Sequence, residues 1–152
     1  MNRFIATFLG VVLVHVAGLA WAGPVEEVAQ IAAARGSAFQ DGNAEAYTAD
    51  FADNAAFHSS FSAFRIEGKA AIKAYFTELF LNYPRRHLFI RQPTARAYND
   101  DLVVHDGYAV LSMVNERGDP KVFEVRYSLT WAKTGGRWQI VDQHVSRLPA
   151  TQ

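Results

Sequence analysis

The sequence contains no cysteine and no excess of either charge. Without cysteine, the chain has no disulfide framework and cannot be a lipoprotein anchored through that residue. Its 15 basic and 15 acidic residues balance, which argues against nucleic acid or an anionic membrane surface as a partner. Internal repeats, linkers and low-complexity tracts are also missing. These absences indicate one globular domain, stabilised by its own core.

Several motifs of catalytic chemistry are missing too. The histidines outside the first 22 residues have no local metal-ligand spacing, and no cysteine supplements them. There is no G-x-S-x-G elbow, and Gly68-Lys69-Ala70 lacks the upstream glycine and the hydroxyl residue of a phosphate loop. Nucleotide and flavin fingerprints are absent as well. We therefore expect no metal and no cofactor.

The first 22 residues have the pattern of a signal peptide. Arg3 precedes an apolar run, and Ala20-Trp21-Ala22 closes it in the small-x-small pattern that signal peptidase reads. An uncleaved membrane anchor is the alternative, because the run is nearly long enough to span a bilayer. We predict a signal peptide over 1–22 with cleavage after Ala22. The mature domain would then cover 23–152, be periplasmic or secreted, and have no attachment to a membrane.

Hydrophobic periodicity predicts helices first and a meander of strands last. Helical spacing runs over 24–41, over 43–55 with Tyr47 and Phe51 on one face, and over 68–83 before Pro84. Residues 55–61 have the character of a strand, and four alternating segments follow at 87–98, 102–114, 121–133 and 137–148. This order predicts an α+β fold, with N-terminal helices packed on a cone-shaped, curved antiparallel sheet.

Three stretches resemble the nuclear transport factor 2-like superfamily, especially its SnoaL-like members. "DGNAEAYTADFADNAAF" is similar to the superfamily's second helix and first strand, and "IEGKAAIKAYFTELF" is similar to its third helix. "WAKTGGRWQIVDQHVSRLP" resembles the terminal hairpin of the calcium/calmodulin-dependent kinase II association domain and its bacterial relatives. The resemblance implies a cystatin-like SnoaL-like domain with a pocket, and a homodimer or higher oligomer.

One property of the kinase subgroup is not carried over. The pocket of the association domain holds carboxylates with arginines on two strands, and the matching positions here are Leu129 and Val145. The superfamily includes isomerases, cyclases, dehydratases and non-catalytic scaffolds, so its fold alone does not decide the chemistry.

The register of the last hairpin decides which residues share a face with the polar positions of its final strand. A plain turn at Gly135-Gly136 would pair Tyr127 with His144, whereas a one-residue bulge separates polar from apolar side chains. We therefore expect the bulged register, which creates a polar row consisting of Arg126, Ser128, Asp142, His144 and Ser146.

Two interpretations of this row stay open. In a catalytic row, His144 would be a general base oriented by Asp142, and Arg126 would hold an anion. In a structural row, the same groups would satisfy one another at a subunit interface. The resemblance places His144 on the outward face, which favours the interface.

The apolar face of the same strands predicts a pocket for a small, largely apolar molecule. Gln143 would orient the ligand. His105, on the same face as Gly107 and Ala109, is a second candidate base, although a core histidine bonded to the backbone fits equally well. The predicted lining is Phe57, Tyr75, Phe76, His105, Tyr127, Leu129, Trp131, Gln143 and Val145.

Three functions follow from these patterns. The first is an exported, homo-oligomeric protein that binds a small apolar molecule without chemistry. The second is a cofactor-independent isomerase, cyclase or dehydratase that uses His144 or His105. The third is a non-catalytic assembly module.

Overall fold

The structure, a computed structural model, describes residues 23–149. In chain order, its elements are α1 (Pro24–Asp41), α2 (Ala44–Thr48), β1 (Phe51–His58), β2 (Ile66–Glu67), α3 (Lys69–Asn82), β3 (Arg85–Asn99), β4 (Leu102–Val114), β5 (Pro120–Thr134) and β6 (Arg137–Arg147).

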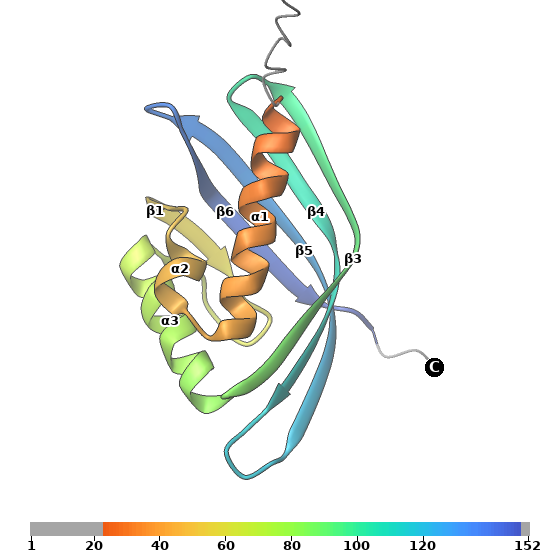
Figure 1. Ribbon diagram of the computed structural model, residues 1–152. Coiled ribbons are helices and arrows are strands. Elements are labelled where there is room, and N and C mark those ends of the chain that lie inside the picture. Colours follow the sequence, from red (N-terminus) through yellow and green to blue (C-terminus); the bar gives the residue numbers. More distant parts are fainter. Residues whose placement is uncertain (1–22, 150–152) are drawn as a thin grey trace, which may run out of the picture.

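The strands form one six-stranded sheet in the order β2-β1-β6-β5-β4-β3. Figure 1 shows the sheet strongly curved and open, with α1 lying against one face and α2 and α3 beside it near β1. The α+β fold with helices packed on a curved sheet is therefore confirmed. One detail differs from the expectation, because β1 runs parallel to β6 and makes the sheet mixed.

The long first helix begins and ends where its sequence indicates. Pro24 occupies the first turn, where its missing N–H costs no hydrogen bond, and Glu26 and Glu27 lie at the positive end of the helix dipole. Gly42 ends the helix with a φ of 72°, a conformation that glycine adopts without strain. Local residue preferences therefore determine both ends of the helix, without any contribution from tertiary packing.

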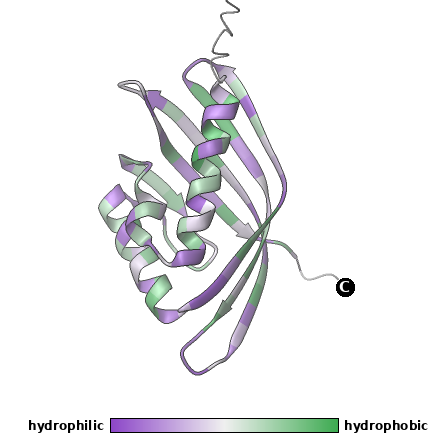
Figure 2. Cartoon of the chain, viewed as in Figure 1, coloured by the Kyte–Doolittle hydropathy of each residue, from purple (hydrophilic) through white to green (hydrophobic). Residues whose placement is uncertain are grey.

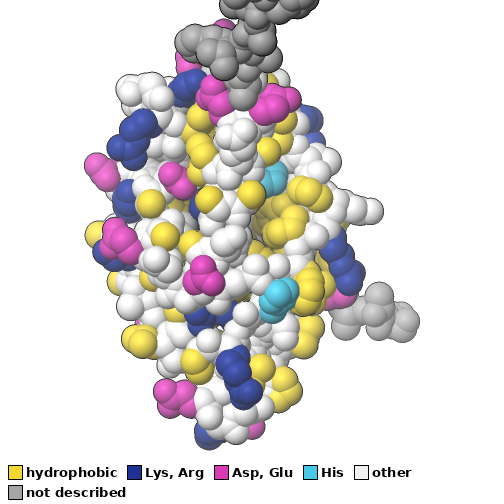
Figure 3. Space-filling view, in the orientation of Figure 1, with side chains coloured by type: hydrophobic (Ala, Val, Ile, Leu, Met, Phe, Trp, Pro, Cys, Tyr) yellow, Lys and Arg dark blue, Asp and Glu magenta, His cyan; other side chains and the backbone are white. Residues whose placement is uncertain are grey.

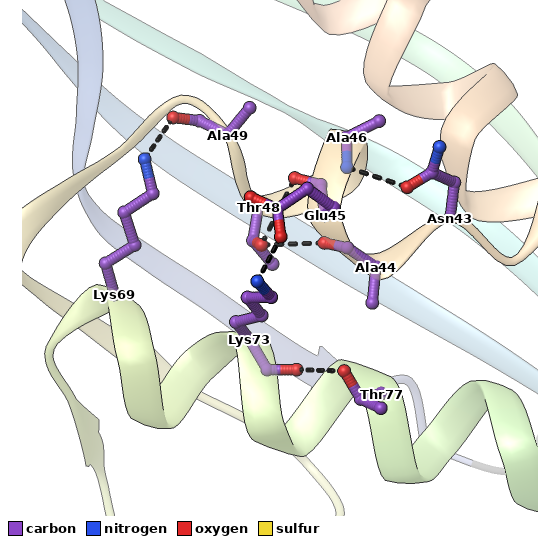
Figure 4. Close-up of polar contacts among 9 residues, drawn as sticks. All are labelled: Asn43, Ala44, Glu45, Ala46, Thr48, Ala49, Lys69, Lys73 and Thr77. Carbon is purple, nitrogen blue, oxygen red and sulfur yellow. Dashed lines mark hydrogen bonds and ion pairs between the residues drawn. The ribbon is translucent and has the colours of Figure 1, made fainter.

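The expected second helix over 43–55 is wrong beyond Thr48. Asn43 caps α2 by accepting a hydrogen bond from the Ala46 N–H at 2.9 Å, and Lys73 of α3 pairs with Glu45 (Figure 4). The chain then turns, and β1 begins at Phe51. Phe51 is completely buried opposite Ile140 of β6. Pairing with a distant strand thus overrides the local helical pattern.

The core lies between the helices and the concave face of the sheet. Along the strands, hydrophobic and hydrophilic residues alternate (Figure 2), as expected for a sheet with one buried face. Both Trp138 Nε1 and Lys133 Nζ donate to Glu27 Oε2, at 2.6 and 2.8 Å. These bonds fasten the first turn of α1 to the β5–β6 hairpin. The largest fully buried apolar side chains are Trp131, Phe51, Ile72, Met113, Ile140, Val28, Val103 and Val125.

The predicted signal peptide over 1–22 and the cleavage after Ala22 lie outside the described residues. Between residues 23 and 149, no helix is both long and apolar enough to cross a membrane.

Candidate functional site

The β5–β6 hairpin adopts the bulged register expected from the sequence. Arg126 pairs with Ser146, Ser128 with His144, and Thr130 with Asp142. The shift lies between Thr130 and Trp131, several residues from the glycine turn. The five predicted polar residues therefore do form one row across the two strands.

This row lies on the outer face of the sheet, and none of its members lines the cavity described below. Arg126 Nε donates to Ser146 Oγ at 3.1 Å, and His144 is exposed. Asp142 does not orient His144. Its carboxylate lies 3.6 Å from Nε2 of His58, whose ring centre is 5.6 Å from that of His144. Sequence patterns alone do not connect His58 with the row, because the β1–β6 pairing that brings it there joins residues far apart in the chain.

A cavity of about 430 Å³ opens on the other face, between the helices and the concave side of the sheet. Figure 3 shows hydrophobic side chains gathered around a hollow beside α1. Eight of the nine residues predicted as lining reach this cavity: Phe57, Tyr75, Phe76, His105, Tyr127, Leu129, Gln143 and Val145.

Trp131 is the exception and has to be removed from the predicted lining. Its side chain is completely buried and belongs to the core. The Arg35 guanidinium carbon lies 5.9 Å from the centre of its ring. Strand parity gave the correct face of the sheet, but parity does not tell how far along the strand the cavity extends.

Aromatic rings form one wall of the cavity. Phe57 of β1 stacks on Phe76 of α3 with ring centres 5.2 Å apart, and Tyr75 meets Phe57 edge to face at 5.5 Å. The Tyr75 hydroxyl is 2.7 Å from Ser59 Oγ. Because the hydroxyl is satisfied by this contact, the wall presents mainly apolar ring surface.

On the opposite wall, His105 and Tyr127 make a polar pair. The Tyr127 hydroxyl lies 3.4 Å from His105 Nε2, whereas Nδ1 of this histidine is buried and has no hydrogen-bond partner among residues 23–149. Burial lowers the pKa of His105, and the positive charge of Arg35 lowers it further. Burial also raises the pKa of Tyr127 to about 12. His105 is therefore a neutral imidazole and Tyr127 a neutral phenol near pH 7.

Arg35, the buried cation of the site, is not among the residues predicted from the sequence. It lies in the middle of α1, is 6% exposed and lines the cavity. Its Nε donates to the Tyr47 carbonyl at 3.1 Å, and its Nη2 donates to Gln143 Oε1 at 3.2 Å. Burial lowers its pKa, but an arginine stays charged in proteins. The available signal was its position on the face of the helix that includes Val28 and Phe39.

The positive charge of this cavity thus comes from a helix. On the strands, Leu129 and Val145 both contribute apolar surface to the lining. Among residues 23–149, no group of three potential ligating side chains is suitably arranged for a metal ion.

Comparison with known proteins identifies the family. The family model of the calcium/calmodulin dependent protein kinase II association domain matches residues 25–149. A Xanthomonas campestris structure described under the same domain name is 24% identical, with a TM-score of 0.73. The alignment covers 83% of this chain and 89% of that one. Among curated proteins, no match to the chain is found.

Two further structures show how widely this fold is shared. A nuclear transport factor 2-like superfamily protein from Salmonella enterica is 19% identical, with a TM-score of 0.73 and coverage of 83% of this chain and 92% of that one. A Novosphingobium aromaticivorans protein described as scytalone dehydratase-like is 10% identical, again with a TM-score of 0.73, and the coverage is 80% and 82%. At these identities the similarity establishes the fold alone.

Proposed function

Because this chain belongs to the calcium/calmodulin dependent protein kinase II association domain family, we propose that it is an exported homo-oligomer that binds a small, largely apolar molecule. The observation that carries the proposal is the cavity of about 430 Å³. Its size falls in the range of cavities that enclose small ligands, and its aromatic wall matches their usual lining. A few polar groups, among them His105, Tyr127 and Gln143, would orient the bound molecule.

Export and assembly rest on separate arguments. Export is supported by the apolar run and the Ala20-Trp21-Ala22 pattern at the start of the sequence. Assembly is supported by the family, whose name describes an association domain. The outer polar row of Arg126, Asp142 and His144 fits an interface, because a subunit contact needs its polar groups to be satisfied.

Native mass spectrometry of the mature protein, purified from the periplasm of the cells that produce it, tests the proposal directly. We expect an oligomer that carries a co-purifying small molecule. Gly36 offers a clean way to block the cavity, since it lies in the lining and a β-carbon added there would meet no atom within 4 Å. Gly36→Phe should fill the space and abolish the bound mass.

Gly36→Ala is the matched control for this experiment. It makes the same change of a helical glycine to an L-residue but adds only one carbon, so the bound molecule should remain. Both variants should fold at least as well as the parent, because glycine is unfavourable inside a helix. An oligomer that never carries a small molecule, from native cells or after incubation with apolar compounds, would contradict the proposal.

A second candidate function is a cofactor-independent isomerase, cyclase or dehydratase. The observation that favours it is the pair of His105 and Tyr127 inside the cavity, where His105 Nδ1 has no hydrogen-bond partner in the described part of the chain. A neutral imidazole of this kind accepts a proton as a general base. His144 and Asp142 do not support this role because they lie on the outer face. Turnover that disappears in His105→Gln while ligand binding persists would favour the enzyme.

A further inference from the structure

Two histidines from distant parts of the chain lie side by side on the outer face of the sheet. His58 of β1 is paired with His144 of β6 in the parallel ladder, and their ring centres are 5.6 Å apart. Asp142 lies two residues before His144 on the same face, with its carboxylate 3.6 Å from Nε2 of His58. This face of the sheet therefore holds two titratable rings within reach of one carboxylate.

The charges around this pair are balanced. Ser128 of β5 is paired with His144, and Arg126 is the next residue of β5 on the same face, where it donates to Ser146. Other carboxylates of the outer face already form ion pairs: Asp106 with Arg96, Glu124 with Arg91, and Glu67 with Arg65. While both imidazoles are neutral, the negative charge of Asp142 and the positive charge of Arg126 cancel, and the polar row has no net charge.

A second copy of this chain is the partner that such a face fits. The helices pack on the concave face of the sheet and leave its outer face uncovered in the described part of the chain (Figure 1). In a two-fold contact the same patch of each copy meets, so a patch with a large net charge would repel its partner. A neutral row that carries one cation and one anion is complementary to itself.

Protonation of the two histidines removes this balance. Histidine is the side chain whose charge changes between about pH 5 and 8. Asp142 compensates the imidazolium that the first proton creates on the pair. A second positive ring beside the first has no carboxylate of the row left to compensate it. In a contact between two copies, both rows become positive together.

From these observations we infer that the pair of His58 and His144 makes assembly pH-dependent: the oligomer is held together across the outer face at neutral pH and dissociates when both rings are protonated. The inference rests on the assembly part of the proposed function and names its regulation. Like charges enclosed at a subunit contact are screened less than in water. Dissociation returns them to water, so the separated subunits bind the protons more readily and are favoured as the pH falls.

Sedimentation of the fluorescently labelled mature protein tests the inference, over a dilution series at about pH 7.5 and at about pH 5.5. We expect an oligomer at the higher pH, and a subunit dissociation constant at least about tenfold larger at the lower pH. Circular dichroism at both pH values should show the same folded protein. This measurement separates dissociation from the acid destabilisation that His105 causes.

Histidine variants assign the response to the pair. In the double variant His58→Gln/His144→Gln, both side chains stay neutral and able to hydrogen-bond, so assembly at neutral pH should persist and the acid response should disappear. Each single variant should retain a smaller response, because Asp142 compensates the one remaining ring; these variants cover the case in which the double variant does not fold. His87→Gln is the matched control. It removes an exposed histidine of β3, which β4 and β5 separate from β6, and should leave the response intact.

Three results would overturn the inference. An oligomer that stays equally tight at the lower pH would show that the histidines do not control assembly, while the proposed oligomer would stand. An acid response that persists in the folded double variant would show that other groups cause it. A monomer at both pH values would contradict this inference and the assembly part of the proposed function together.

Discussion

Phe51→Ala tests whether the chain around residue 51 is a buried strand or the face of a helix. The ring of Phe51 is completely buried, and the Arg35 guanidinium carbon lies 5.2 Å from its centre. Truncating a fully buried phenylalanine to alanine costs about 3–5 kcal/mol of unfolding free energy, through lost burial and the cavity left behind. For a domain of this size, that loss lowers the melting temperature by about 10–20 °C.

Urea unfolding of the mature protein, followed by tryptophan fluorescence, measures this loss, and calorimetry gives the melting temperature. Phe64→Ala is the matched control, because Phe64 is 84% exposed and its removal should change the unfolding free energy by less than about 0.5 kcal/mol. A loss below about 1 kcal/mol for Phe51→Ala would refute the reasoning. It would mean that residue 51 lies at the surface and that β1 does not insert between β2 and β6.

Other perturbations address the pH response, the outer row and the cavity. Folding lowers the pKa of His105 from 6.5, so the unfolded chain binds a proton at this histidine more readily than the folded protein does. The free energy of unfolding should therefore be highest above about pH 6.5 and should decline as the pH falls below that value. His105→Gln should reduce that decline in urea titrations at several pH values, and an unchanged profile would contradict a lowered pKa. His144→Ala should lower the oligomer mass measured by light scattering, or the melting temperature, whereas Asp100→Ala in the exposed β3–β4 turn should alter neither. A fully assembled, equally stable His144→Ala protein would exclude the interface role. Gly107→Ala would place a β-carbon 2.8 Å from the Tyr127 hydroxyl, so we expect a loss of about 1–3 kcal/mol in urea unfolding, and a neutral effect would argue against this close approach.

The candidate site could be predicted from the sequence in part. The register of the β5–β6 hairpin could be predicted from the alternation of its strands, because only one register puts polar and apolar side chains on opposite faces. The same alternation selected eight residues that reach the cavity. Trp131 was misplaced because alternation reports the face of a residue and carries no information on where the cavity ends.

Arg35 illustrates a different limit of sequence reasoning. Within the pattern of α1 it is a single cation among apolar positions, and a solvated arginine at the edge of a helix would look the same. Its burial depends on Tyr47, Trp131 and Gln143, which come from α2, β5 and β6. Only the packing of these elements shows that the charge is enclosed.

By itself, the sequence determined the local features of this protein: the ends of α1, the cap of α2, the antiparallel meander and the polar and apolar faces of its strands. These depend on proline, glycine, capping side chains and periodicity, which act over a few residues. Tertiary structure alone decided that Phe51 belongs to a strand, that His58 joins Asp142, and that Arg35 lies buried in the cavity. Each of these requires contact between residues far apart in the chain, and their energy exceeds the local preferences that they override.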